Sequence, residues 1–99
     1  MTINLEELVL TNNKLTSISA EIGKLINLTR LYLSYNKLTG EIPALIGQLS
    51  NLTELDLYGN QLTGEIPDDV LKLSELKSIS FYNPSAEQRD VVKELLVTC

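Results

Sequence analysis

A chain of 99 residues is sufficient for one domain, and its 43% hydrophobic residues can supply a core. The net charge of −5 comes without any run of basic residues, which argues against nucleic-acid binding, and no apolar stretch is long enough for a transmembrane helix. With no histidine and one cysteine, the chain cannot form a Ser-His-Asp triad, a Cys-His pair or a zinc site of the usual kind. We therefore expect no enzyme activity, cofactor, metal, nucleic-acid partner or membrane partner.

The first predicted element is a short strand just after Leu5, in a segment that returns along the chain. Its pattern is L-x-x-L-x-L-x-x-N, in which the second and third leucines alternate like the inward face of a strand. The copies are Leu5–Asn13 (LEELVLTNN), Leu28–Asn36 (LTRLYLSYN), Leu52–Asn60 (LTELDLYGN) and Leu76–Pro84 (LKSISFYNP). Their first leucines are 23, 24 and 24 residues apart, a period typical of solenoid proteins.

Each of the first three copies ends in an asparagine, at Asn13, Asn36 and Asn60. An asparagine side chain can hydrogen-bond to neighbouring backbone groups inside a turn. Because the copies follow one another at a fixed period, we expect these side chains to stack as a ladder that satisfies backbone groups of adjacent coils.

The segment after each strand must carry the chain back for the next parallel strand. The hexapeptide LTGEIP stands in this segment twice, at Leu38–Pro43 and Leu62–Pro67. Gly40 permits a tight bend, and Pro43 keeps the preceding residue extended. We predict a return made of turns and short helical or extended pieces, with these residues pointing inward: Leu38, Ile42, Ile46 and Leu49.

The combined pattern LxxLxLxxNxLTGEIPxxIGxLxxL stands at Leu28–Leu52 and again, with changes, at Leu52–Leu76. It resembles the leucine-rich-repeat family, and LTGEIP is similar to the plant-specific subtype known from receptor-kinase ectodomains. The resemblance implies an α/β leucine-rich-repeat solenoid, a short horseshoe arc with a parallel β-sheet on its concave side. It implies one domain over 1–99, with repeats at about 5–27, 28–51 and 52–75 and a partial repeat at 76–84. The first repeat is shorter and lacks the Gly and Pro of LTGEIP, and Pro84 replaces the ladder asparagine in the last.

The last predicted element is a helix over about residues 86–97. Ser85 and Gln88 have the spacing of a capping box, and apolar residues follow at helical spacing. We expect this helix to cap the last coil, with partner binding as the alternative. Cys99 is interpreted as a terminal thiol without a disulfide partner in the chain.

The first coil has no comparable cap in the sequence, because only four residues precede Leu5. Its leucines would expose one side to water beside an unpaired strand edge, and such a surface usually marks an interaction site. We therefore predict a homo-oligomer that associates through this coil. The candidate residues are Ile3, Leu5, Leu8, Val9, Leu10 and Ile26, several of which are apolar where the other repeats carry polar residues. Neutral variation is the alternative explanation.

The outward strand positions form a second candidate surface, and all four tyrosines occur there. Tyrosine offers a large contact area with a polar tip and is enriched at binding sites, although strand preference alone also favours it. Glu7, Arg30 and Glu54 share one column and predict a cross-strand charge ladder. Tyr58 and Tyr82 share another column and are predicted neighbours. The candidate partner-binding residues are Arg30, Tyr32, Tyr35, Glu54, Asp56, Tyr58, Ser80 and Tyr82.

These features predict a non-catalytic protein–protein interaction module that self-associates through its first repeat. The alternative is a fragment similar to a receptor ectodomain, binding a peptide or protein on its tyrosine-bearing concave face. The sequence shows neither a basic-then-apolar leader nor paired cysteines, so we expect a cytoplasmic location.

Overall fold

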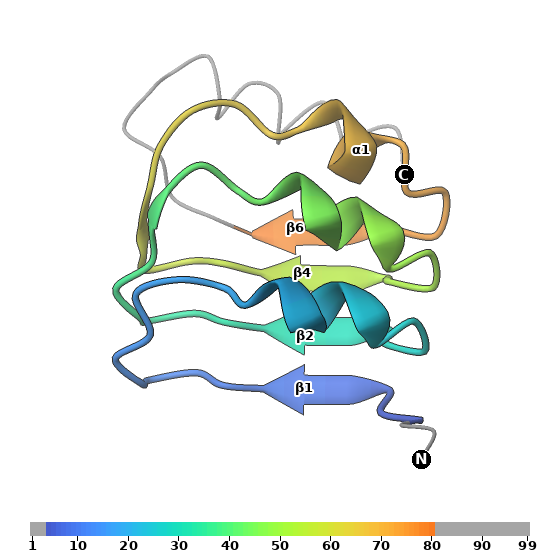
Figure 1. The fold of residues 1–99 in the computed structure, drawn as a ribbon, viewed down its shortest axis with the longest axis horizontal. Coiled ribbons are helices and arrows are strands. Elements are labelled where there is room, and N and C mark those ends of the chain that lie inside the picture. Colours follow the sequence, from blue (N-terminus) through green and yellow to red (C-terminus); the bar gives the residue numbers. More distant parts are fainter. Residues whose placement is uncertain (1–3, 81–99) are drawn as a thin grey trace.

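The computed structural model describes residues 4–80, which form a solenoid of stacked coils (Figure 1). Four short strands make a parallel sheet in the order β1-β2-β4-β6, with one strand from each coil. Each strand has three residues: β1 is Glu7–Val9, β2 is Arg30–Tyr32, β4 is Glu54–Asp56 and β6 is Ser78–Ser80. The register places the inward residues Leu8, Leu31, Leu55 and Ile79 in one column. The predicted parallel sheet and its repeat alignment are therefore confirmed.

Short helices form the opposite side of the first three coils, and in Figure 1 they stack in the same order as the strands. The first two are 3-10 helices, η1 at Ala20–Lys24 and η2 at Ala44–Gln48, and the third is the α-helix α1 at Asp68–Leu71. At the start of the two LTGEIP returns lies a second sheet of two parallel strands, β3 at Thr39–Gly40 and β5 at Gln61–Leu62. Short helical and extended pieces were predicted here, but the pairing of β3 with β5 was not.

The core fills the space between the sheet and the helices. Sixteen hydrophobic residues between Leu28 and Ser80 are buried, among them the four predicted to point inward from the first LTGEIP return: Leu38, Ile42, Ile46 and Leu49. The inward residues of the first coil only pack partly buried against this core: Leu8, Leu10, Leu15, Ile18, Ile22 and Leu25. Each coil therefore depends on a neighbour on both sides to be fully covered.

The predicted asparagine ladder is confirmed at Asn36 and Asn60, each of which ties its coil to the one before it. The hydrogen bonds of Asn13 within residues 4–80 go instead to carbonyls of its own coil. Asn36 accepts a hydrogen bond from the Leu15 N–H (3.1 Å) and donates to the Leu10 carbonyl (3.0 Å). Asn60 repeats this arrangement one coil later, with the Leu38 N–H (3.0 Å) and the Leu33 carbonyl (2.9 Å). The amide side chain thus satisfies backbone groups that no strand partner reaches.

Several predictions fall outside residues 4–80. They are the capping helix over 86–97 with its Ser85 box, the partial repeat beyond Ser80, Cys99, and the candidate residues Ile3 and Tyr82. Within the described part of the chain, none of the helices is long and apolar enough to cross a membrane.

Candidate functional site

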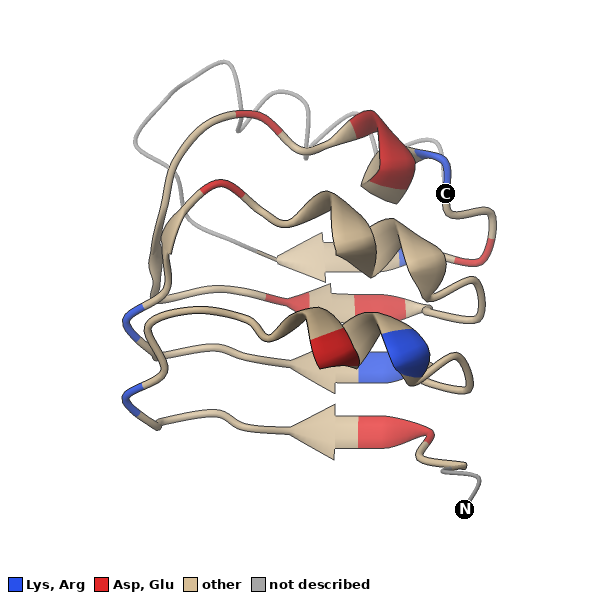
Figure 2. Ribbon diagram, in the orientation of Figure 1, with Lys and Arg blue, Asp and Glu red and all other residues tan. Residues whose placement is uncertain are grey.

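The solvent-facing side of the four-stranded sheet, here called the sheet face, carries a charged network across three strands. In Figure 2 a blue segment on β2 lies between red segments on β1 and β4. Arg30 contacts Glu7 on one side (Nη1 to Oε2, 3.3 Å) and Glu54 on the other (Nε to Oε2, 2.9 Å). The predicted charge ladder is therefore confirmed. Ion pairs this exposed contribute at most about 1 kcal/mol each, so their main effect is to fix the orientation of the side chains.

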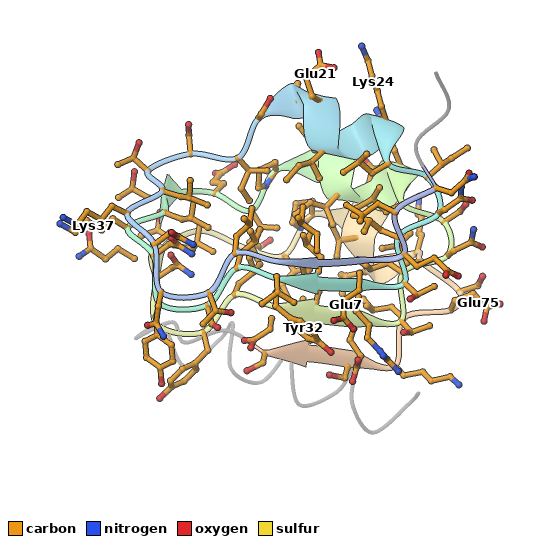
Figure 3. The ribbon with its side chains drawn as sticks, turned by 90° about the horizontal axis from the view of Figure 1, so that it is seen from below. Glu7, Glu21, Lys24, Tyr32, Lys37 and Glu75 are labelled. Carbon is orange, nitrogen blue, oxygen red and sulfur yellow. The ribbon has the colours of Figure 1, made fainter. Side chains whose placement is uncertain are left out.

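Tyr32 joins this network from the adjacent outward position of β2. Its hydroxyl donates a hydrogen bond of 2.7 Å to Oε2 of Glu54, the oxygen that also contacts Arg30. This hydrogen bond, with partial desolvation, raises the pKa of Tyr32 above its usual 10.0. The hydrogen bond to Glu7 and the charge of Glu54 raise the pKa of Arg30, so the guanidinium stays charged. Figure 3 shows Tyr32 and Glu7 on the side of the molecule opposite Glu21 and Lys24.

Asp56 occupies the next outward position on β4, in register with Tyr32 and Ser80. Its Oδ1 accepts a hydrogen bond of 3.1 Å from the Tyr58 backbone N–H, which orients the carboxylate. Among the ion pairs within residues 4–80, none involves Asp56. The sheet face therefore carries an oriented negative charge that no cation of the described chain neutralises.

Tyr35 and Tyr58 form an aromatic pair beyond the ends of β2 and β4. Their ring centroids are 5.9 Å apart with an interplanar angle of 77°, an edge-to-face contact between adjacent coils. The two residues remain 54% and 45% exposed, so the pair is a fixed aromatic surface rather than part of the core. The sequence predicted Tyr58 beside Tyr82, which lies outside the described residues, and did not predict the contact with Tyr35.

The backbone at Tyr35 adopts a left-handed conformation, with φ of 55°. The equivalent positions in the neighbouring coils are Asn12 (φ 61°) and Gly59 (φ 79°), residue types that accept this conformation readily. For a tyrosine it costs about 1–2 kcal/mol. The ring of Tyr35 also occupies the space above Gly59, where an added Cβ would lie 2.6 Å from the ring. The glycine at position 59 is the feature of the sequence that could have indicated the close approach of the Tyr35 ring.

The residues predicted for self-association fall into different settings. Val9 (54% exposed) pairs in register with Tyr32 and so lies on the sheet face. Ile26 (57% exposed) lies in the turn before β2, where its carbonyl accepts a hydrogen bond from Asn51. Leu8 and Leu10 are half-buried against the core, and Leu5 is 38% exposed. Of the predicted self-association residues within 4–80, these three leucines belong to the open flank of the first coil.

A family model described as leucine rich repeat matches residues 3–62, more than half of the chain. The chain belongs to the leucine-rich-repeat family. Comparison with curated proteins gave no match.

Similar solved structures are also leucine-rich-repeat proteins or plant proteins of the same fold. A Leptospira interrogans leucine-rich-repeat protein is 40% identical over 96% of this chain, with a TM-score of 0.83. The plant peptide hormone receptor RGFR1, in complex with RGF2, is 34% identical over 78% of this chain (TM-score 0.69). A plant ice-binding protein is 33% identical over 78% (TM-score 0.69). This chain spans 24%, 13% and 27% of those three chains, respectively. The plant receptor among them agrees with the predicted plant-type repeat.

This leucine-rich-repeat chain also has a hollow on its helical side, between η2 and α1. The hollow measures about 600 Å³ and is lined by both apolar and polar groups, including Leu45, Gln48, Asp69 and Leu73. It is open to solvent, and sequence reasoning did not single it out. Within residues 4–80, no group of three or more potential metal ligands lies together.

Proposed function

We propose that this chain is a non-catalytic module that binds an extended peptide segment of a protein partner on its sheet face. Leucine-rich-repeat domains typically mediate protein–protein interactions, and one similar structure is a peptide hormone receptor in complex with RGF2. The observation that carries the proposal is the fixed arrangement on one face: the Glu7–Arg30–Glu54 ladder, held by Tyr32, beside an exposed tyrosine pair.

The arrangement suits recognition because its side chains are oriented before any partner arrives. Arg30 is held from both sides, and one oxygen of Glu54 accepts from both Arg30 and Tyr32. Groups held in this way lose little conformational entropy on binding. Tyrosine and arginine are also the residue types that contribute most to protein interfaces.

The size of the sheet face favours a peptide over a folded domain. Four strands at about 4.8 Å spacing give a face less than about 20 Å wide. A stable complex between folded proteins buries about 800 Å² on each partner. An extended segment needs less width, because its own side chains alternate and one row can follow the outward columns.

The test is selection of binders from a random twelve-residue peptide library displayed on phage, with the 99-residue chain as the target. Selected peptides are then synthesised and their affinities measured by fluorescence anisotropy. We expect Arg30→Ser and Tyr32→Ser to weaken binding at least tenfold. The matched control is Glu21→Ser, which removes an exposed ion pair with Lys24 on the helical side and should leave affinity unchanged. Binding that is insensitive to both sheet-face variants would contradict the proposal.

We propose self-association through the first coil as a second candidate function. Its support is the exposure of Leu5, with Leu8 and Leu10 half-buried, at the edge where β1 pairs with β2 alone among the described strands. A two-fold dimer that pairs two β1 edges would extend the sheet and cover both flanks.

Light scattering after size-exclusion chromatography, across a dilution series, tests this second candidate. A dimer is expected at tens of micromolar, and Leu8→Lys should convert it to a monomer. Lysine is chosen for position 8 because a dimer contact between two first coils would then have to bury a charge. A monomer at the highest concentration, or a dimer that Leu8→Lys leaves intact, rules out association through this flank.

A further inference from the structure

Tyr35, one member of the tyrosine pair beyond β2 and β4, stands at a backbone position that does not favour a tyrosine. The column that contains Asn12, Tyr35 and Gly59 calls for a left-handed backbone, and two of its three members suit that conformation. A tyrosine at the middle position is tolerated because Gly59 leaves room for the ring. Strained positions of this kind are typical of functional sites.

A purely structural reason for a tyrosine at position 35 would be its ring contact with Tyr58. An edge-to-face pair contributes an amount similar to the strain that the left-handed backbone introduces. The two effects therefore nearly cancel, and an asparagine, as found at Asn12, should serve the fold equally well. Because the ring is 54% exposed, the remaining consequence of a tyrosine here is an aromatic surface offered to solvent.

The charges on the sheet face indicate which chemistry suits that surface. The face carries three carboxylates, at Glu7, Glu54 and Asp56, against the single guanidinium of Arg30. Arg30 contacts Glu7 and Glu54, whereas no ion pair within residues 4–80 involves Asp56, so Asp56 is the carboxylate left without a cation. Tyr58 follows two residues later, just beyond the end of β4, and its backbone N–H donates the hydrogen bond to the Asp56 carboxylate. Lys37, although close to Tyr35 in sequence, points away from the sheet face (Figure 3).

We propose that Tyr35, Tyr58 and Asp56 form an anchoring site for a basic side chain, arginine or lysine, of the bound peptide segment. The carboxylate of Asp56 pairs with the cationic head, and the tyrosine rings receive its aliphatic stem and attract the cation through their faces. The hydrogen bond from the Tyr58 N–H fixes the carboxylate, and Gly59 admits the ring of Tyr35. This inference rests on peptide binding at the sheet face, and it adds the residue type that the partner supplies.

The same phage-displayed library tests the inference through the composition of the selected peptides and their response to variants. We expect an arginine or lysine at one fixed position of the selected peptides. Replacing that residue by glutamine should weaken binding to the wild-type chain at least tenfold. With Asp56→Asn, the same peptide replacement should weaken binding less than threefold, because the charge partner is already gone.

Tyr35→Asn separates a binding role from a structural one. We expect about tenfold weaker peptide binding. The melting temperature should stay within about 4 °C of wild type, because the substitution removes both the backbone strain at Tyr35 and the stabilising ring contact with Tyr58. Tyr58→Ser provides a second variant at the same site that leaves the backbone strain unaltered. The control Glu21→Ser should change neither quantity.

Each other outcome overturns the inference in a recognisable way. One outcome excludes the anchoring site but keeps peptide binding at the sheet face. In that outcome the selected peptides lose affinity with Arg30→Ser, but they carry no basic residue at a fixed position, or they bind the Asp56→Asn and Tyr35→Asn variants as well as the wild type. A failure to select any peptide, or affinity that no sheet-face variant alters, excludes both the anchoring site and the proposed function. A large drop in melting temperature for Tyr35→Asn, without a specific loss of binding, assigns the tyrosine pair to the fold.

Discussion

The first and second coils carry the same leucine pattern, but only the second is enclosed. Leu31 of the second coil is 0% exposed and lies between its register partners Leu8 and Leu55. Leu8 occupies the same place in the first coil, has one such partner, and is only half-buried. The difference shows that a leucine in this fold is stabilised by the coils on both sides of it.

The ladder asparagines show the same contrast. Asn36 makes four hydrogen bonds, two of them to the backbone of the preceding coil at Leu10 and Leu15. Within residues 4–80, Asn13 bonds only to carbonyls of its own coil, at Leu10 and Thr11. One residue type at one repeat position therefore links two coils in the second repeat and only closes a turn in the first.

The largest expected effect is on the enclosed leucine. Leu31→Ala should destabilise the chain by about 3 kcal/mol, because it removes a buried side chain that two flanking coils hold in place. The matched change Leu8→Ala should cost about 1 kcal/mol, since that side chain already contacts water. Urea unfolding followed by circular dichroism measures both. Equal losses would mean that the open flank of the first coil is covered in solution, as self-association requires.

The second largest effect on stability is expected at the ladder asparagines, where Asn36 and Asn13 can be compared. Asn36→Ala should cost about 2 kcal/mol, because the Leu15 N–H and the Leu10 carbonyl lose a partner in a partly buried site. Asn13→Ala should cost less than about 1 kcal/mol, since water can replace its two exposed bonds. The same unfolding experiment applies. A cost at Asn13 as large as that at Asn36 would show that the ladder does not act between coils.

The third effect compares two glycines with the same backbone conformation, Gly59 (φ 79°) and Gly40 (φ 77°). Gly40→Ala should cost about 1 kcal/mol from backbone strain alone, because nothing lies within 4 Å of the added Cβ. Gly59→Ala should cost more, because the ring of Tyr35 must also move. In a Tyr35→Asn background the two costs should become equal, which a double-mutant cycle measures. A difference that persists without the ring would contradict this account.

The smallest effect concerns Tyr32. Because its pKa in the folded state lies above the unfolded value near 10.0, its bond to Glu54 stabilises the fold below pH 10 and is lost as the pH rises through the folded pKa. Ultraviolet titration should show a phenol that ionises later in the wild type than in Glu54→Gln. As the pH rises above 10, the free energy of unfolding should fall less for Tyr32→Phe than for the wild type. Identical titration curves would mean that this hydrogen bond is absent in solution.

The repeated side chains made much of this structure predictable from the sequence. Leucine spacing fixed which residues turn inward, the period aligned the strands, and the shared column of Glu7, Arg30 and Glu54 predicted the ion pairs. These features follow from alternation along a strand and from nearly equal repeat lengths, both of which are local properties of the chain.

The tertiary structure determined which side chains at different repeat positions contact each other. Tyr35 meets Tyr58 across different repeat positions, because a left-handed residue redirects one ring and a glycine in the next coil leaves room for it. Val9 lies on the sheet face, as its outward strand position predicts, and Leu8 beside it turns toward the core. Column patterns record which residue types recur, whereas side-chain contacts depend on backbone angles and on the space that neighbouring coils leave. For that reason the sequence alone determined the solenoid and its charge ladder, and only the stacking of the coils determined the aromatic pair.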